Sequence, residues 1–127
     1  MPISYRIDAA AGVVFVTFQG RVTDQDMLEG QRQLAGDPAF RPTMHQCVDA
    51  RGVTDLSITA AGVRELAKGS IFGPGSRRAI IAESATIYGY GRMFQILRDT
   101  SGDVIRVFWA IEDAHRWLGL DDKSPDL

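Results

Sequence analysis

The chain has 127 residues, of which 45% are hydrophobic and 24% are charged, an ordinary composition for one globular domain. Its 14 Lys and Arg against 16 Asp and Glu give a net charge of -2, which argues against a nucleic-acid-binding surface. The single cysteine, Cys47, excludes an intramolecular disulfide, and no apolar run approaches the ~18 residues of a transmembrane helix. Because no signal peptide is recognisable, we expect a cytoplasmic location.

The first forty residues predict a β-hairpin followed by a helix. Apolar and polar residues alternate over 3–8, and a second apolar run covers 13–18. The short link between these runs is typical of an antiparallel hairpin. Thr23 is expected to cap the first helix, with Asp26 completing a capping box. Gly36-Asp37-Pro38 ends that helix.

The middle of the chain predicts a strand, a polar loop and a second helix. The strand covers 44–50 and contains Cys47, which we expect to be a buried, inert thiol. The run ends in Asp49-Ala50-Arg51-Gly52, and a polar loop is expected to follow at the carboxyl end of the strand, a place where ligands often bind in α/β domains. Thr59 can cap the second helix, whose inner face is predicted to carry Val63, Leu66, Ala67 and Ser70.

The last third predicts two more strand–helix units. A fourth strand is predicted at 78–83, and the short continuous apolar run within it indicates burial on both faces. Ser84 or Thr86 begins a third helix, with an inner face predicted to carry Tyr90, Met93, Phe94 and Leu97. A fifth strand is expected at 104–109, and a last helix ends at Gly119. The polar segment 121–127 is expected to be a tail of the single domain 1–120.

The predicted element order is therefore ββαβαβαβα. Strands separated by helices of this length imply right-handed parallel crossovers. We expect an α/β fold with a five-stranded, mixed but mostly parallel sheet, in which the first strand of the hairpin is antiparallel and lies at or near an edge.

No complete catalytic, cofactor or metal motif is present. Gly89-Tyr90-Gly91-Arg92-Met93-Phe94 begins like a dinucleotide fingerprint, but Phe94 stands where the third glycine is needed. Tyr88, Tyr90 and Arg92 lie near a predicted helix N-terminus, which can hold an anion; alternatively, Tyr90 belongs to the core and Arg92 to a solvated face. The two histidines lack partners at ligand spacing. We expect no metal and no cofactor.

Asp49 and Arg51 form a pair of opposite charges beside the predicted strand end. We expect them to bond each other and the loop N–H groups, and thereby to fix the turn. The alternative is that Asp49 acts as a base or binds a ligand, but the sequence offers no partner nucleophile.

Three segments of the chain resemble the SpoIIAA-like domains of the STAS superfamily, and especially its small stand-alone bacterial STAS/SEC14-type proteins. The segments are Val48-Asp49-Ala50-Arg51-Gly52-Val53, Tyr88-Gly89-Tyr90-Gly91-Arg92-Met93, and Val107-Phe108 with the later 112–119. The likeness extends over 3–119 and implies the SpoIIAA-like fold. Its motifs are structural rather than catalytic, so it specifies the fold better than the function.

The resemblance also implies two kinds of function. Anti-anti-sigma proteins of this superfamily carry a phosphorylated serine at the start of the second helix, but here Asp49 is followed by Ala50-Arg51-Gly52 and the matching serine is absent. Ser57 and Thr59 are the nearest hydroxyls, and both are ordinary cap candidates. By analogy with SEC14-type domains, the resemblance implies a small apolar or lipid-like ligand. Ile71, Phe72 and Trp109 are candidates to line such a pocket, or else to cover the core edge or a homodimer contact.

We therefore expect a non-enzymatic STAS-like module that binds a protein partner or a small apolar, lipid-like ligand. The candidate surface comprises Asp49, Arg51, Ser57, Thr59, Phe72, Tyr88, Tyr90, Arg92 and Trp109. The alternative is an anti-anti-sigma-like regulator that is switched by phosphorylation at Ser57 or Thr59. An enzyme is the third hypothesis, disfavoured because no nucleophile–base pair is visible.

Overall fold

The structure is a computed structural model, and it describes residues 1–120. The elements follow the predicted order ββαβαβαβα. Their bounds are β1 (Ile3–Asp8), β2 (Val13–Thr23), α1 (Asp24–Ala35), β3 (His45–Ser57), α2 (Ala60–Lys68), β4 (Arg77–Ile81), α3 (Ala85–Leu97), β5 (Val104–Phe108) and α4 (Ile111–Trp117). The predicted tail, 121–127, lies outside the described residues.

One mixed sheet organises the molecule, with its strands in the spatial order β1-β2-β3-β4-β5. Strand β1 pairs antiparallel with β2, and every other neighbouring pair is parallel. The prediction of a mostly parallel sheet with an antiparallel first strand at its edge is therefore confirmed. Each parallel connection passes through a helix, as such crossovers require.

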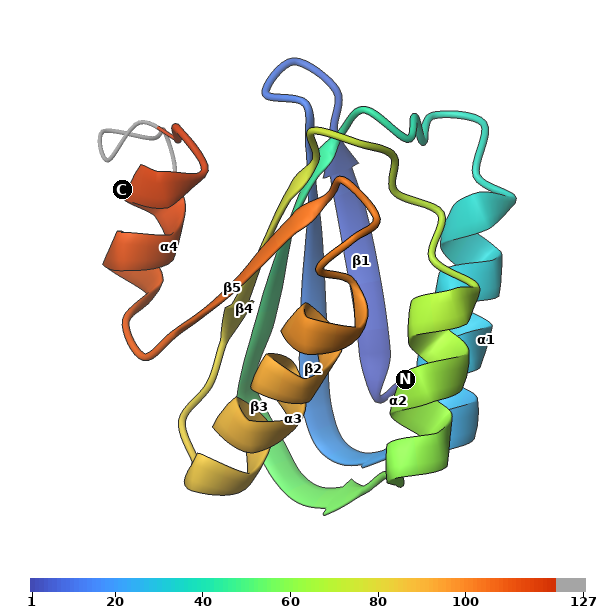
Figure 1. The fold of residues 1–127 in the computed structure, drawn as a ribbon, viewed down its shortest axis with the longest axis vertical. Coiled ribbons are helices and arrows are strands. Elements are labelled where there is room, and N and C mark those ends of the chain that lie inside the picture. Colours follow the sequence, from blue (N-terminus) through green and yellow to red (C-terminus); the bar gives the residue numbers. More distant parts are fainter. Residues whose placement is uncertain (121–127) are drawn as a thin grey trace.

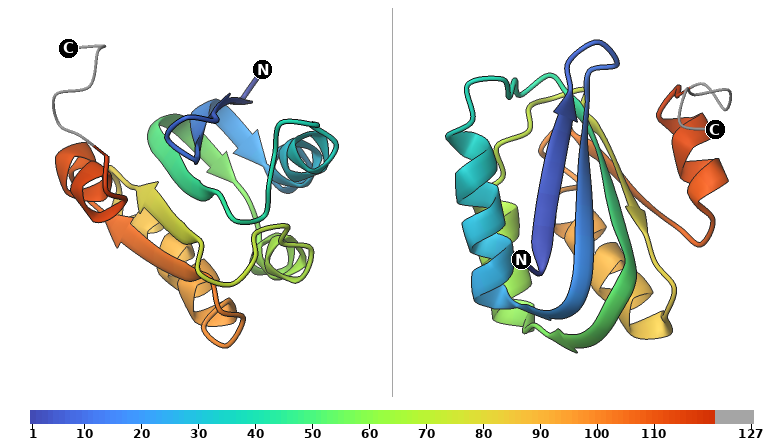
Figure 2. Two further views of the ribbon diagram at one scale, coloured as in Figure 1. Left: turned by 90° about the horizontal axis from the view of Figure 1, so that it is seen from above. Right: turned by 180° about the vertical axis from the view of Figure 1, so that it is seen from behind.

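The helices are divided unequally between the two faces of the sheet. Helices α1, α2 and α3 cover one face, whereas α4 lies alone on the other (Figures 1 and 2). On the α4 face, buried Val13, Cys47 and Ala79 pack with residues of α4. On the face with three helices, Val14 and Val48 belong to a second core cluster. The sheet is thus apolar on both sides in its centre, as expected for parallel strands under helices.

The helix starts follow the local signals in the sequence. Thr23 accepts a hydrogen bond from the backbone N–H of Asp26 (3.1 Å), and the Asp26 carboxylate accepts one from the N–H of Thr23 (2.9 Å), so the predicted capping box is present. Thr59 caps α2 with its side chain alone, which accepts from the N–H of Gly62. Of the two candidates for the third helix, Ser84 is the cap. Each cap gives a partner to an otherwise free N–H of the first turn.

The predicted loop after the third strand is wrong, because β3 continues to Ser57. Strand β2 is also longer than predicted and stays beside β3 as far as Thr23. Two register shifts between β2 and β3 accommodate this extension, each with one extra residue in β3, and Gly20 of β2, at φ 68°, lies at one of them. The pairing of β3 with β4 stops at Asp49. Beyond Asp49, β3 therefore pairs only with β2.

Three smaller expectations also need correction. Leu97 was predicted on the inner face of α3, yet it is 38% exposed, and Ile87 and Gly91 are buried there instead. Ser70 lies beyond the end of α2. Trp109 follows β5 rather than belonging to it. Within the described part of the chain, no helix is both long enough and apolar enough to cross a membrane.

Candidate functional site

A cavity of about 140 Å³ lies between the sheet and helices α1, α2 and α3. Its wall is almost entirely apolar and takes side chains from β1 to β4 and from all three helices. Representative lining residues are Val16, Val48, Val63, Phe72, Ile80 and Phe94. The site is thus built from segments that lie far apart in the sequence.

The alternation of side chains along the strands explains why this wall is apolar. Val16 in β2, Val48 in β3 and Ile80 in β4 occupy positions that point to the same face of the sheet. At Gly91 in α3, an added Cβ would lie 2.9 Å from Cγ2 of Val107, so the glycine lets the helix approach the sheet closely. Ala50 leaves a small side chain in the wall at the next inward position of β3.

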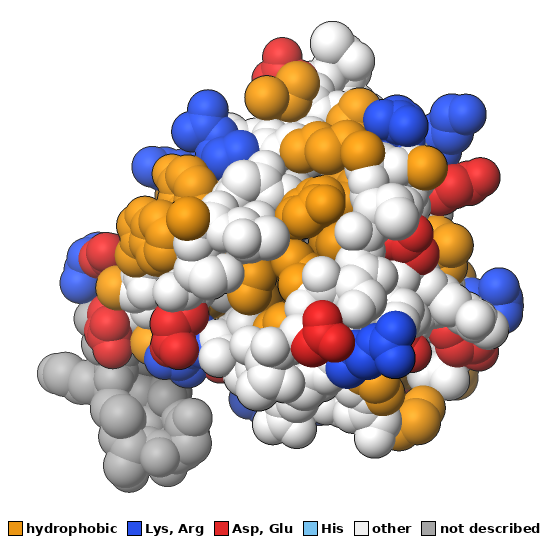
Figure 3. All heavy atoms as spheres, turned by 90° about the horizontal axis from the view of Figure 1, so that it is seen from below, with side chains coloured by type: hydrophobic (Ala, Val, Ile, Leu, Met, Phe, Trp, Pro, Cys, Tyr) orange, Lys and Arg blue, Asp and Glu red, His pale blue; other side chains and the backbone are white. Residues whose placement is uncertain are grey.

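Apolar side chains also reach the surface at the carboxyl ends of the parallel strands. Leu56 and Ile58, both lining residues, are only half-buried. The view onto this end shows hydrophobic side chains gathered near the middle of the face (Figure 3). Partly exposed apolar side chains therefore border the cavity at this end.

One charged side chain, Arg78 of β4, lines the cavity and is only 5% exposed. Its Nε donates to Oε1 of Gln46 (2.9 Å), and its Nη1 donates to Oγ of Ser70 (2.9 Å) and to Oδ2 of Asp103 (3.0 Å). Cζ of the guanidinium lies over two aromatic rings, 4.4 Å from the centroid of Phe72 and 4.9 Å from that of Phe94. Such stacking and pairing compensate for much of the cost of burying the charge.

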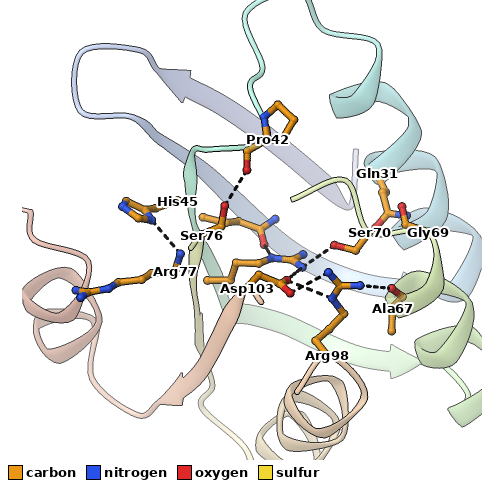
Figure 4. A network of polar contacts seen from close by, with 12 residues as sticks. Gln31, Pro42, His45, Ala67, Gly69, Ser70, Ser76, Arg77, Arg98 and Asp103 are labelled. Atoms are coloured by element: carbon orange, nitrogen blue, oxygen red, sulfur yellow. Dashed lines mark hydrogen bonds and ion pairs between the residues drawn. The ribbon is translucent and has the colours of Figure 1, made fainter. Parts of the chain in front are cut away.

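Asp103 pairs with both Arg78 and a second arginine, Arg98. Figure 4 shows the pairing of Asp103 with Arg98. Arg98 binds both carboxylate oxygens of Asp103, with Nη2–Oδ1 at 2.8 Å and Nε–Oδ2 at 3.2 Å. The Asp103 side chain is completely buried. Burial lowers the pKa of Arg78 to about 10, an effect that Asp103 opposes, so Arg78 remains charged at neutral pH.

The structure separates the residues that were predicted to form one surface. Phe72 and Tyr90 line the cavity, and so does Ile71. Asp49 and Arg51 occupy alternate positions of β3 that point to the α4 face, because Val48 and Ala50 between them point to the cavity. The predicted residues thus lie on both sides of the sheet.

Asp49 and Arg51 form a two-pronged ion pair, with Nε–Oδ1 at 2.9 Å and Nη2–Oδ2 at 2.8 Å. Asp49 also accepts from the backbone N–H of Arg51 (3.1 Å). These hydrogen bonds, chiefly the one from the Arg51 side chain, lower the pKa of the Asp49 carboxyl. The mutual pairing matches the expectation, although it lies within a strand rather than a loop.

The two candidate switch hydroxyls are both hydrogen-bonded. Oγ1 of Thr59 accepts from the N–H of Gly62 (3.0 Å) and donates to Oδ2 of Asp24 (2.6 Å). Oγ of Ser57 donates to Oδ1 of Asp55 (3.1 Å). A phosphate on Thr59 would displace the cap and meet the Asp24 carboxylate.

The remaining candidates lie outside the cavity wall. The rings of Tyr88 and Trp109 stack with centroids 4.7 Å apart and planes 2° apart, and Trp109 is 56% exposed. Arg92 lies exposed on α3. Neither Trp109 nor Arg92 lines the cavity.

Cys47 and the residue types that bind metals are the other reactive groups in the part of the chain that the structure describes. Burial raises the pKa of the Cys47 thiol to about 12, so the expectation of a buried, inert thiol holds. Residues 1–120 contain no group of three or more His, Cys, Asp or Glu that could hold a metal ion.

Sequence reasoning missed Arg78, Asp103 and Gln46. One signal was available, because Arg78 opens an otherwise apolar strand that was predicted to be buried on both faces. A charge at such a position demands a buried partner. The sequence could not identify that partner, because Asp103 lies 25 residues from Arg78 along the chain.

Comparisons with known proteins agree with this architecture. No protein-family model matches the chain, and no curated protein matches it. Among solved structures, it is similar to an uncharacterized protein of the DUF3478 family with a SpoIIAA-like fold from Shewanella loihica PV-4. The two share 21% sequence identity with a TM-score of 0.60, over 91% of this chain and 93% of that chain. The chain therefore has the SpoIIAA-like fold that its sequence predicted.

Proposed function

We propose that this SpoIIAA-like domain is a non-catalytic module that binds a small apolar ligand in the cavity between the sheet and α1–α3. The observation that carries the proposal is the apolar cavity of about 140 Å³, whose wall includes buried residues of two core clusters. Protein interiors rarely leave voids of this size, because packing density approaches that of organic crystals.

The size of the cavity sets the scale of its ligand. An engineered apolar cavity of about 150 Å³ stays dry and binds benzene. The cavity here is of similar volume, so it suits a single ring or a short chain. A longer lipid-like chain needs the half-buried end near Leu56 and Ile58 to open further.

Binding fits this site better than catalysis does. Most of the wall offers no functional group that could transfer a proton or attack a substrate. Its phenols are already engaged, since Oη of Tyr5 donates to Oδ2 of Asp37 (2.7 Å) and Oη of Tyr90 donates to the carbonyl of Ile58 (3.4 Å). A nucleophile–base pair, which covalent catalysis requires, does not occur among the lining residues of this described part.

Thermal unfolding in the presence of benzene tests the proposal. A ligand that binds only the folded state raises Tm with its concentration. We expect benzene to raise Tm of the wild type and of Ala79→Leu, whose site lies on the α4 face, but not of Ala50→Leu, which fills the cavity. Native mass spectrometry of freshly purified protein should show a bound small molecule. Equal Tm shifts in all three proteins, or no shift in the wild type, would reject the proposal.

The alternative function, a phosphorylation switch, has weaker support. Thr59 uses its hydroxyl to cap α2 and to bind Asp24, so it has a complete structural role. Ser57 is half-buried and bonded to Asp55. The exposed Trp109 leaves a protein partner or a homodimer as further predictions, which oligomer measurements would test.

A further inference from the structure

We propose that the cavity selects an apolar ligand that ends in a carboxylate, and that Arg78 binds this carboxylate. The inference rests on the proposed function and names the chemical class of its ligand. It starts from the one charged side chain in an otherwise apolar wall.

The guanidinium of Arg78 has hydrogen-bond donors that are not used within the described part of the chain. Its Nε and Nη1 bind Gln46, Ser70 and Asp103. For Nη2, residues 1–120 provide no hydrogen-bond acceptor. A guanidinium carries five N–H donors, and two of these belong to Nη2. A ligand with acceptor oxygens would complete this set.

The neighbouring rings restrict how a ligand can reach this group. Cζ of Arg78 lies over the rings of Phe72 and Phe94, and both rings line the cavity. Because these rings and the partners of Nε and Nη1 already surround much of the guanidinium, the edge left for a ligand is that of Nη2. Edge-on approach is the geometry in which arginine binds carboxylates.

The local charge is unbalanced in the direction that favours an anion. Arg78 and Arg98 carry two positive charges, and Asp103 supplies one negative charge. The three side chains are nearly or completely buried, with exposed fractions of 6%, 13% and 0%. Within residues 1–120, neither arginine forms a salt bridge with any other carboxylate. The excess of one positive charge lies where little water screens it, so an anionic ligand gains more here than at the surface.

Two kinds of molecule share this chemistry, short fatty acids and aromatic acids. Each consists of an apolar body, matched to the wall, and one carboxylate, matched to Arg78. Two pairs of compounds with nearly the same shape isolate the effect of the charge on affinity. One pair is benzoate and benzamide, and the other is hexanoate and hexanamide. The preference between benzoate and hexanoate then tells an aromatic body from an aliphatic one.

The test is an NMR titration of the full chain with these four compounds at neutral pH. Charge-assisted hydrogen bonds are about twice as strong as neutral ones, so each carboxylate should bind roughly tenfold or more tightly than its amide. Equal affinities within both pairs would overturn the inference and leave the proposed function standing. Failure of all four compounds, with benzene also failing to bind, would overturn both.

Variants then assign the preference to Arg78. Arg78→Gln should reduce the carboxylate-to-amide ratio to near one, whereas Arg106→Gln, on an exposed arginine outside the cavity wall, should leave it unchanged. Asp103→Asn removes the competing carboxylate and should raise the ratio if it folds. A ratio that stays high in folded Arg78→Gln would show that the charge is bound elsewhere, against the inference. If Arg78→Gln does not fold, the ligand pairs on the wild type and on Asp103→Asn decide the question.

Discussion

Filling the cavity with a larger side chain should cost no stability, in contrast to the same change on the other face of the sheet. Ala50 in β3 is 3% exposed and lines the cavity. Ala79 in β4 is 0% exposed and packs in the α4-side core. Ala50→Leu and Ala79→Leu therefore add the same three carbon atoms at two buried strand positions, only one of which borders empty space.

The expected magnitudes follow from the cavity volume. At about 24 cal/mol per Å³, an empty cavity of 140 Å³ costs the fold about 3 kcal/mol relative to a filled one. Three buried carbons, at about 0.8 kcal/mol each, recover at most about 2 kcal/mol of this. Overpacking a filled core instead costs about 1–3 kcal/mol. Ala50→Leu should thus be neutral to about 2 kcal/mol more stable than wild type, and Ala79→Leu about 1–3 kcal/mol less stable.

Urea unfolding followed by circular dichroism measures both free energies of unfolding. The m-value reports whether the two variants unfold from equally compact states. If Ala50→Leu destabilises the protein as much as Ala79→Leu does, the space beside Ala50 is filled in solution, and the reasoning from the cavity is refuted.

Three further predictions concern the frame around the cavity. Gly91→Ala should lower the free energy of unfolding by about 1–3 kcal/mol, because the added Cβ meets Val107 of β5. Gly89→Ala, whose added Cβ lies in open space, should raise it by about 0.5–1 kcal/mol. Urea unfolding measures both changes, and equal effects of the two variants would contradict the prediction. Thr59→Ala should lose about 1 kcal/mol with the α2 cap, and Ser57→Ala less than about 0.5 kcal/mol, in the same assay. Burial lowers the pKa of His45 in the folded state below its usual 6.5. As the pH drops below about 6.5, His45 is protonated more readily in the unfolded state than in the folded state, so the free energy of unfolding falls. Denaturation midpoints between pH 7 and pH 5 should show this fall, and His45→Gln should reduce it.

The element order and the sheet were predictable because their signals are local. Thr23 and Asp26 form the capping box that their spacing predicts, and Thr59 caps α2. Side-chain alternation identified β1, and the short link after it identified the hairpin, in which Gly12 has a φ of 70°. Such signals depend on neighbours within a few residues, so they survive in any context that allows the element to form.

The extension of β3 and the position of the candidate site depended on long-range contacts. The segment after Asp49 is polar like a loop, and it becomes a strand because β2 continues beside it through two register shifts. Alternation along β3 places Asp49 and Arg51 on the face away from the cavity. Successive side chains of a strand point to opposite faces of the sheet. When a strand is predicted as a loop, this alternation is not applied, and residues from both faces are grouped into one predicted surface.

Only part of the cavity wall could be predicted from the sequence. Ile71, Phe72 and Tyr90 were candidates, and the structure places all three in the wall. Trp109 was grouped with them, but it stacks on Tyr88 outside the wall. Empty space arises where several elements fail to fill a volume together, and no single residue pattern records this.

Methyl NMR during a benzene titration tests the central claim most directly. The cavity wall contains methyl groups of Val48, Val63 and Ile80, whereas the methyl groups of Val13 and Ile81 lie in the α4-side core. Binding in the cavity predicts saturable shifts, caused by the aromatic ring, for the first group and unchanged positions for the second. Shifts of equal size on both faces, or none up to the solubility limit of benzene, would contradict the account of this domain as an apolar-ligand-binding module.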